Sequence, residues 1–241
     1  MAWYKEWFGQ EYLELYAHRD AGEAARHVDF VERHLAPRHP EPEAVLDLAC
    51  GAGRHTQELR ARGYRTLGID LSVTLLAHPP RVPNVAGNMR QLPFRDQSFD
   101  WLLNFFTSFG YFERERENFR VLEEIERVLR PGGRFLIDVL NREPVIAGLK
   151  PSEVQEIAGR KVYIERWFDE ATQRINKRMR LEEPGKASQT YLESVRAYSR
   201  DEVTIGARWA GLEVDDLYGN FQGVPFDRDS ERLILVGHRP V

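Results

Sequence analysis

Apolar side chains recur every three or four residues at the start of the chain, the spacing of an amphipathic helix. This pattern predicts helical structure within residues 3–18 and a second helix over Glu23–Leu35. Prolines then end the helical pattern, at Pro37, Pro40 and Pro42. The apolar stripe of the first stretch consists of Trp3, Trp7, Phe8, Tyr12, Leu15 and Tyr16.

From Ala44 onward, short apolar runs alternate with helical stretches. Strands are expected over Ala44–Ala49, Arg65–Ile69, Asn84–Gly87, Phe99–Asn104 and Phe135–Leu140. Helices are expected over Arg54–Arg62 and Glu113–Leu129, and the second of these is followed by a turn at Pro131-Gly132-Gly133. Apolar strands that alternate with helices are typical of an α/β fold, in which helices cover both faces of a parallel sheet.

The pattern changes over residues 160–200, where strands follow one another without helices between them. These strands are expected over Lys161–Phe168, Arg174–Leu181 and Gln189–Tyr198. They predict a small antiparallel β insert on the parallel core. Asp201 is expected to cap a last helix over Glu202–Ala210, and Leu212–Tyr218 and Glu231–Gly237 to be the final strands.

This pattern divides the 241 residues into three parts. Residues 1–40 are expected to form a helical lid or cap, with plain core packing of their apolar stripe as the alternative. Residues 41–159 and 201–241 are expected to form the core, and residues 160–200 the insert on the substrate side. In an open α/β sheet, ligands bind beyond the carboxyl ends of the strands. The candidate chemistry is therefore sought where the predicted strands end.

The first predicted strand of the core runs into a glycine turn and then a helix, over Val45–Arg54. Gly51 and Gly53 allow the backbone to approach a ligand closely. The helix behind them offers free N–H groups to a polar ligand. Asp70 ends the next strand, where an acid accepts hydrogen bonds from ribose hydroxyls.

Two details distinguish among nucleotide cofactors. A dinucleotide site needs a third glycine where this chain has Thr56, and the Gly-Lys-Ser/Thr of a phosphate-binding loop is absent. Asp47 would repel a pyrophosphate but suits a ligand with an amino group. S-adenosylmethionine has a ribose and an amino group and no phosphate. The alternative is a tight strand–helix turn without a ligand.

Residues 45–72 resemble the first two motifs of the class I S-adenosylmethionine-dependent methyltransferases. Three later segments also look like motifs of that family, in the same order: Asn88–Phe94, Phe99–Asn104 and Leu129–Phe135. The resemblance covers residues 44–140. It implies a seven-stranded, mostly parallel Rossmann-like sheet with helices on both faces. The C-terminal strands and the insert are more loosely similar to small-molecule methyltransferases, including sugar N-methyltransferases.

The resemblance also implies a set of cofactor contacts. S-adenosylmethionine, and S-adenosylhomocysteine as product, would be held by Asp47, Gly51, Ala52, Gly53, Arg54, Asp70, Leu71, Asn88, Met89, Asn104 and Phe105. One departure is Asn88, where the family often has Asp. An asparagine carbonyl still accepts a hydrogen bond from the adenine amino group. Adenine binding is therefore expected to be weakened or reoriented rather than lost.

Methyl transfer from a sulfonium is an in-line displacement, so the protein mainly aligns the acceptor and excludes water. A general base is needed only where the acceptor must lose a proton. Candidates for a catalytic residue are Tyr111, Tyr12 and Tyr198, and no metal is expected. Candidate acceptor contacts are Tyr12, Tyr16, Thr107, Ser108, Tyr111, Arg166, Arg196 and Tyr198.

The composition and charge of the chain limit the kinds of partner that it can bind. The net charge of −4 argues against a nucleic-acid-binding surface over the whole chain. A single cysteine, Cys50, excludes an internal disulfide framework and fits a cytoplasmic protein. No apolar run is long enough for a membrane span, and the N-terminal residues do not resemble a signal peptide. A small-molecule acceptor and a monomer or homodimer are expected.

Two other functions remain open. A basic stripe on the insert favours an RNA or protein methyltransferase on the same core, and it consists of Arg174, Lys177, Arg178 and Arg180. A noncatalytic nucleotide-binding module or activator subunit is the second alternative. His27, His34, His39 and His55 are expected to be surface residues.

Overall fold

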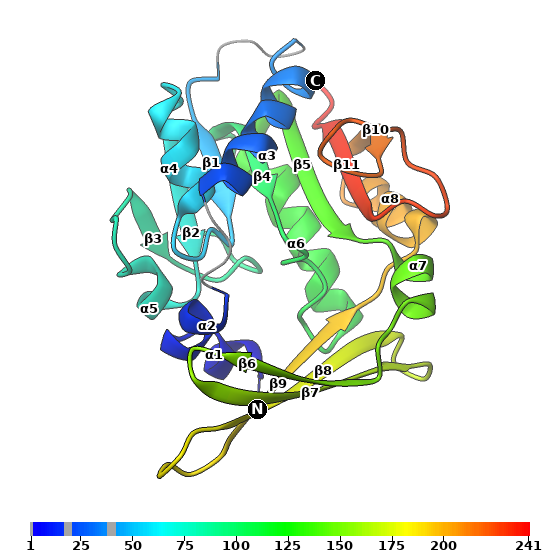
Figure 1. The fold of residues 1–241 in the computed structure, drawn as a ribbon. Coiled ribbons are helices and arrows are strands. Elements are labelled where there is room, and N and C mark those ends of the chain that lie inside the picture. Colours follow the sequence, from blue (N-terminus) through cyan, green and yellow to red (C-terminus); the bar gives the residue numbers. More distant parts are fainter. Residues whose placement is uncertain (1, 17–20, 38–41) are drawn as a thin grey trace.

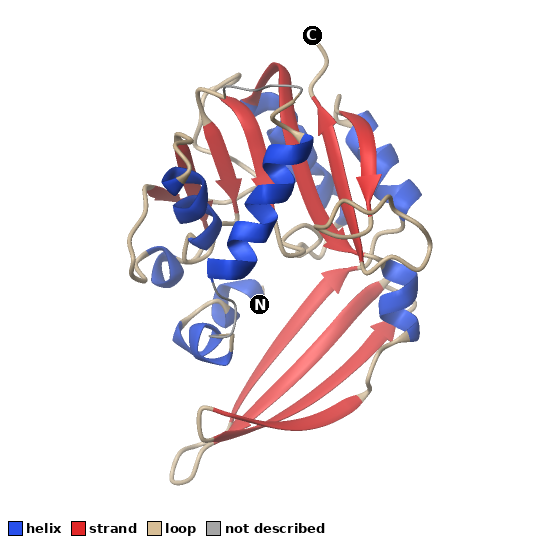
Figure 2. Cartoon of the chain, turned by 45° about the horizontal axis from the view of Figure 1, so that its top comes forward, coloured by secondary structure: helices blue, strands red, loops and turns tan. Residues whose placement is uncertain are grey.

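The computed structural model describes residues 2–16, 21–37 and 42–241 and contains two sheets (Figures 1 and 2). The larger sheet has seven strands in the order β10-β11-β5-β4-β1-β2-β3. Its strands are β1 (Val45–Leu48), β2 (Thr66–Asp70), β3 (Asn84–Ala86), β4 (Phe99–Asn104), β5 (Leu129–Leu140), β10 (Glu213–Tyr218) and β11 (Arg232–His238).

Strands β1 to β5 of this sheet are parallel, and only β11 runs against its neighbours β5 and β10. The predicted mostly parallel, seven-stranded Rossmann-like sheet is therefore confirmed. Because the strands are parallel, the carboxyl ends of β1, β2 and β4 meet at one edge. This arrangement brings together three residues: Gly51 in the loop after β1, Asp70 at the end of β2 and Phe105 directly after β4.

Helices cover both faces of the large sheet. Helices α3 (Ala21–His34) and α4 (Arg54–Ala61) pack on one face, and α6 (Glu115–Val128) and α8 (Arg200–Trp209) pack on the other. The short helix α5 (Val73–Leu76) lies beside β2 and β3, and α7 (Arg142–Ala147) follows β5 on the way to the insert. One core joins α3 to the sheet through Phe30, Val31 and Trp101, and the other joins α6 through Leu122 and Ile125. All six residues of β4 are buried, as expected for a strand covered on both faces. None of the described helices is long and apolar enough to cross a membrane.

The second sheet is the predicted antiparallel insert, with one strand more than expected. Its order is β6-β7-β8-β9, with bounds Ser152–Ile157, Arg160–Asp169, Arg174–Glu182 and Gln189–Arg196. Figure 2 shows it as a curved layer below the large sheet. The sequence pattern missed β6 because this edge strand is mostly polar. The short helices α5 and α7 were missed as well, since each is shorter than two turns.

Two further expectations are corrected at helix ends. The expected helix within residues 3–18 is two short helices, α1 (Tyr4–Trp7) and α2 (Gln10–Leu15), separated at Gly9, a residue with low helix propensity. Residues 17 and 18 lie outside the described residues. The cap of α8 is Ser199 rather than Asp201, because the Ser199 hydroxyl accepts a hydrogen bond from the Glu202 N–H.

A buried arginine fastens the insert to the core. The guanidinium of Arg174, in β8, donates to the backbone carbonyls of Gly110, Tyr111 and Phe112 at 2.9–3.1 Å. It also donates to the carbonyl and hydroxyl of Ser194 in β9. Burial lowers the pKa of Arg174. These bonds connect the insert to the loop after β4, so the insert has a fixed place over the strand ends.

We expect Arg174→Met to lower the free energy of unfolding by at least about 3 kcal/mol, because several buried carbonyls lose their donor. Urea denaturation followed by circular dichroism measures this loss. Arg178→Met is the matched control, since Arg178 is exposed on the same strand and pairs with Glu165 at 3.0 Å. Its loss should stay within about 1 kcal/mol. Equal losses in the two variants would contradict the docking role.

Candidate functional site

A cavity of about 860 Å³ lies between the strand ends of the large sheet and the insert. Its floor is the glycine loop after β1 together with the ends of β2 and β4. Helices α1 and α2 close one side and pack against the insert sheet, which forms the wall opposite the floor (Figure 1). The cavity is therefore built from all three parts of the chain that the sequence pattern separated.

The glycine loop and Asp70 form one hydrogen-bonded unit on the floor. One carboxylate oxygen of Asp70 accepts from the Gly51 N–H at 2.9 Å and the other from the Ser72 N–H at 2.8 Å. Burial raises the pKa of Asp70, while these backbone bonds lower it. Each oxygen keeps a lone pair for a ligand. Asp70 thus both fixes the loop and remains able to accept hydrogen bonds in the cavity.

Asp47 lies behind the loop and is fully buried. Its carboxylate accepts a 2.6 Å bond from the hydroxyl of Thr56, the residue that stands where a dinucleotide site has its third glycine. Burial raises the pKa of Asp47 to about 6. Burial also raises the pKa of the neighbouring Cys50 thiol, so this cysteine is poorly suited to act as a thiolate nucleophile.

Most of the expected cofactor contacts line the cavity: Asp47, Gly51, Ala52, Arg54, Asp70, Leu71, Asn88, Met89 and Phe105. Gly53 and Asn104 are corrected. Gly53 is the left-handed residue that begins α4, and a Cβ there would come within 2.4 Å of Val82. Asn104 is buried and donates to the Leu48 carbonyl at 2.9 Å, bridging β4 and β1. Both residues support the loop from behind.

Asn88 lines the cavity, but its carbonyl oxygen is already engaged. It accepts from the backbone N–H of Arg90 at 3.0 Å and from the Arg90 side chain at 3.2 Å. These two bonds use both lone pairs of the oxygen. The bond expected from this oxygen to an adenine amino group therefore requires a local rearrangement.

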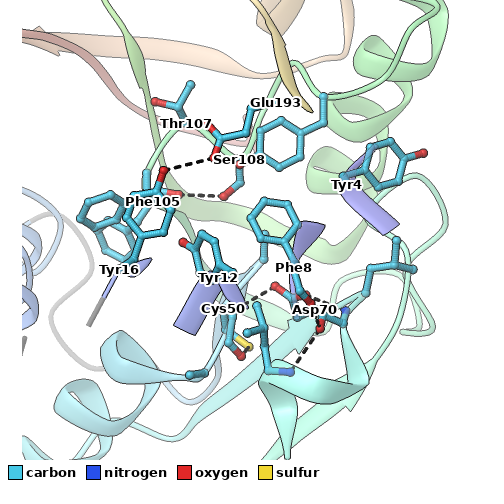
Figure 3. A pocket seen from close by; sticks show the side chains of 18 of the residues that line it. Tyr4, Phe8, Tyr12, Tyr16, Cys50, Asp70, Phe105, Thr107, Ser108 and Glu193 are labelled. Carbon is cyan, nitrogen blue, oxygen red and sulfur yellow. Dashed lines mark hydrogen bonds between the residues drawn. The ribbon is translucent and has the colours of Figure 1, made fainter. Parts of the chain in front are cut away.

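Aromatic side chains form the wall made by α1 and α2 and by the loop after β4. The wall consists of Trp3, Tyr4, Phe8, Tyr12, Tyr16, Tyr111 and Phe112. Trp3 packs edge-on against Tyr111, with ring centroids 4.8 Å apart, and Phe8 stacks on Tyr111 at 5.8 Å. Thr107 and Ser108 also line the cavity, close to this wall (Figure 3).

Polar bonds hold this N-terminal segment on both sides of the cavity. The Ser72 hydroxyl donates to the Phe8 carbonyl at 2.6 Å, beside Asp70. On the insert side, the Tyr16 hydroxyl donates to Glu193 at 3.2 Å, as the dashed line in Figure 3 marks. Arg160 and Glu14 form an ion pair at 2.6 Å. The arrangement is that of a cover fastened at both edges.

The insert presents one charged row to the cavity. Arg166, Lys177 and Glu193 stand opposite one another on β7, β8 and β9, and all three line the cavity. The neighbouring cross-strand pairs on the same face are apolar: Ile164 with Met179 and Phe168 with Ile175. Arg166 pairs with Glu153 at 2.6 Å. The sequence pattern does not identify Lys177 and Glu193 as cavity residues, because it does not fix which face of each strand points inward.

Two expected acceptor contacts are corrected for the same reason. Arg196 is out of phase with Glu193 on β9 and pairs with Glu202 at 2.6 Å. Tyr198 is buried in the core against Phe109, with ring centroids 5.1 Å apart, and burial raises its pKa. Neither lines the cavity. The expected contacts that do line it are Tyr12, Tyr16, Thr107, Ser108, Tyr111 and Arg166.

The expectation that His27 and His55 lie on the surface is also wrong. Both are buried, and His27 Nδ1 lies 3.0 Å from His55 Nε2. His55 lines the cavity from the first turn of α4. Within residues 2–16, 21–37 and 42–241, no group of three or more His, Cys, Asp or Glu side chains is placed to hold a metal ion.

Residues 46–137 match the family model of the methyltransferase domain. A demethylmenaquinone methyltransferase from Mycolicibacterium paratuberculosis is 31% identical over 185 residues, which are 73% of this chain and 72% of the relative. The cypemycin N-terminal methyltransferase of a Streptomyces species is 27% identical over 213 residues, 81% and 82% of the two chains. The match to a demethylmenaquinone methyltransferase of Mycobacterium sp. (strain KMS), 41% identical over 97 residues, spans 39% of this chain and only 40% of the relative.

Solved structures agree on the fold. An S-adenosylmethionine-dependent methyltransferase from Clostridium acetobutylicum superimposes with a TM-score of 0.80 at 16% identity, over 95% of this chain and 96% of the other. An amino pentose methyltransferase from Micromonospora echinaspora, solved with S-adenosylmethionine bound, gives 0.72 at 22% identity, over 95% and 97%. The sequence match over nearly three quarters of the chain and the shared fold together mean that this chain belongs to the class I S-adenosylmethionine-dependent methyltransferases.

Proposed function

We propose that this protein transfers the methyl group of S-adenosylmethionine to a small-molecule acceptor by in-line displacement. The observation that carries the proposal is the extent of the cavity between the strand ends and the insert. It joins the glycine loop and Asp70 on its floor to an aromatic and polar wall on the opposite side. A donor held on the floor and an acceptor held against the wall would meet without passing through bulk water.

The residues of the floor fit this cofactor. The Asp70 carboxylate lines the cavity with unused lone pairs, which suit two ribose hydroxyls. The glycine loop has no side chain at Gly51, where the left-handed backbone (φ 57°) approaches the cavity. When bound, S-adenosylmethionine supplies a methyl group on a good leaving group. Asp47 would face its ammonium group from behind the loop.

The wall supplies alignment and exclusion of water. Tyr12 and Tyr111 give flat apolar surfaces with hydroxyl tips, and they remain the candidate catalytic residues that line the cavity. Glu193, fastened by Tyr16 and lying 3.9 Å from the Lys177 amine, is a carboxylate on the acceptor side. For an amine or hydroxyl acceptor, such a group can take the proton that the acceptor loses.

The charges of the insert do not favour an RNA or protein acceptor. Strand alternation turns Lys177 toward the cavity and the other three side chains toward the opposite face, where Arg174 is buried and Arg178 and Arg180 are exposed. The outer two are paired with Glu165 and Glu182. A continuous basic surface is therefore not formed, and an enclosed cavity suits a small acceptor better.

Amine acceptors deserve the first trial, because two of the similar proteins are named for amine substrates, an N-terminal methyltransferase and an amino pentose methyltransferase. We further propose that the protein is cytoplasmic, as its single cysteine, Cys50, suggests, and that it is a monomer or homodimer. We retain the division into a lid over residues 1–40, a core and an insert, with the insert now beginning at β6.

The proposal is tested by turnover. With S-adenosylmethionine and a mixture of small amines, hydroxy compounds and quinols, we expect S-adenosylhomocysteine to form together with an acceptor heavier by one methyl group. Mass spectrometry detects both products. Formation of neither across a broad mixture, by a protein that binds S-adenosylmethionine, would favour the noncatalytic alternative.

Asp70→Ala should weaken S-adenosylmethionine binding by about ten- to a hundredfold, because two ribose hydroxyls lose a charged acceptor. Isothermal titration calorimetry measures the change, and the wild-type protein should bind NAD far more weakly than S-adenosylmethionine. Asp96→Ala is the control, since Asp96 is exposed and does not line the cavity. Unchanged affinity in a folded Asp70→Ala protein would place the ribose elsewhere.

Residues 3–16 should gain protection from amide hydrogen exchange when S-adenosylhomocysteine binds. The physical reason is that Phe8 and Tyr16 line the cavity, so a bound ligand adds contacts to a segment otherwise held by its packing on the insert and by its bonds to Ser72 and Glu193. Exchange followed by mass spectrometry measures the effect, with helix α8 as the internal control. Equal protection with and without ligand would mean that the segment is permanent packing rather than a lid.

A further inference from the structure

The pair of buried histidines next to the glycine loop is not used by the chemistry described above. His55 is only 4% exposed, and its ring stacks on that of Phe105 with centroids 4.1 Å apart. His27, from α3, stacks in turn on Phe221 at 3.8 Å. Two polar rings are thus held inside an aromatic stack. Burying polar groups in this way is costly unless their nitrogens find partners.

One nitrogen of His55 has a partner and the other does not. Nε2 lies 3.0 Å from Nδ1 of His27. Among the residues that the structure describes, Nδ1 of His55 has no hydrogen-bond partner, and His55 lines the cavity. A nearly buried imidazole with one unused polar atom therefore borders the cavity. This nitrogen is available to a bound molecule.

The strand order tells which part of the cofactor this nitrogen would meet. The glycine loop follows β1, and β1 lies between β2 and β4. Asp70, the expected ribose acceptor, ends β2 on one side, and Asn88 and Met89 follow β3 beyond it. His55 lies on the other side, against Phe105 at the end of β4. With the nucleoside on the β2 side, the amino-acid end of the cofactor falls beside His55.

The charges around the pair favour an anion there. Arg54 precedes His55 in α4, and its guanidinium lies over the Phe106 ring at 4.2 Å while pairing with Glu23. Arg232 lines the cavity and pairs with Asp138 at 2.7 Å. Arg26, in α3, is a third cation acting on His27. Since α4 also points its first turn toward the cavity, its free N–H groups add positive potential.

Both rings are neutral at pH 7. Burial lowers the pKa of His27 to about 4, and Arg54, Arg232 and Arg26 lower it further while Glu23 raises it. Burial likewise lowers the pKa of His55, with help from Arg54 and His27. A neutral imidazole has one N–H donor and one acceptor nitrogen. If Nδ1 of His27 donates to Nε2 of His55, the proton of His55 must lie on Nδ1, the atom without a partner.

We infer that His55 binds the carboxylate of the methionine part of S-adenosylmethionine, donating a hydrogen bond from Nδ1 beside the first turn of α4, and that His27 positions it by fixing its tautomer. This inference rests on the proposed cofactor. It adds a residue that the glycine motif does not include. The inference assigns the carboxylate to His55 rather than to Arg54, because the Arg54 guanidinium is paired with Glu23.

The test compares two ligands that differ only in this group, S-adenosylmethionine and decarboxylated S-adenosylmethionine. For His55→Phe, which keeps an aromatic ring for stacking, calorimetry should show an affinity for S-adenosylmethionine lowered by about ten- to a hundredfold, the range for a lost charge-assisted hydrogen bond. The affinity for the decarboxylated ligand should change less than about threefold. His34→Phe, a histidine of α3 that does not line the cavity, is the matched control.

His27 is tested as a positioning residue. His27→Phe should reduce the same selectivity between the two ligands, and His27→Asn, whose side-chain amide nitrogen lies near the position of Nδ1 and can donate to Nε2 of His55, should restore part of it. Should His55→Phe not fold, nitrogen-15 NMR of the wild-type protein gives the answer. Nδ1 of His55 should carry the proton, and its signal should shift with S-adenosylmethionine but not with the decarboxylated ligand.

The outcomes are distinct. Equal losses for both ligands in His55→Phe, or no loss for either, would overturn the carboxylate contact while leaving the proposed function intact. A protonated Nε2 in the wild-type NMR spectrum would overturn it as well. Failure of the wild-type protein to bind either ligand would instead overturn the proposed function, and this inference with it.

Discussion

The carboxylate of Asp70 connects three segments that must be aligned for a site to exist. Its two oxygens hold the N–H groups of Gly51 and Ser72, so the end of β2 fixes the glycine loop after β1. Ser72 in turn donates its hydroxyl to the Phe8 carbonyl, which places the N-terminal segment over the same spot. The residue expected to receive the ribose thus also determines where the cover lies. Two adjacent hydrogen bonds thus link Asp70 to the N-terminal segment through Ser72.

The insert completes the cavity from the other side through strand alternation. Arg174, on β8, anchors the sheet to the loop after β4, and three residues later Lys177 faces the cavity. Because side chains on a strand alternate between faces, a change of one residue exchanges the cavity wall with the solvent face. The alternation places Lys177 and Glu193 on the face that lines the cavity, and it places Arg178 and Arg196 on the other face.

Several polar residues of the site cannot be identified as functional from the sequence, because their roles depend on burial. His27 and His55 occupy helix positions that look like any amphipathic face, yet aromatic rings from two other segments, at Phe105 and Phe221, enclose them. Desolvation keeps both rings neutral and makes their hydrogen bonds specific. The same enclosure holds Asp47 against Thr56, which occupies the position of a dinucleotide-binding glycine. A low-dielectric floor strengthens each remaining interaction with a charged ligand.

The sequence by itself determined the parallel core, its order of elements and the place of the glycine loop and Asp70, because apolar periodicity and glycine geometry are local properties of the chain. It also determined the family through motifs that lie within single strand–turn–helix units. Only the tertiary structure decided the rest: the edge strand β6, the inward phase of Glu193, the withdrawal of Tyr198 into the core and the pairing of His27 with His55. These depend on contacts between residues up to 177 positions apart, as between Tyr16 and Glu193. No local pattern carries such information, since which side of a strand or helix is enclosed is set by its neighbours in space.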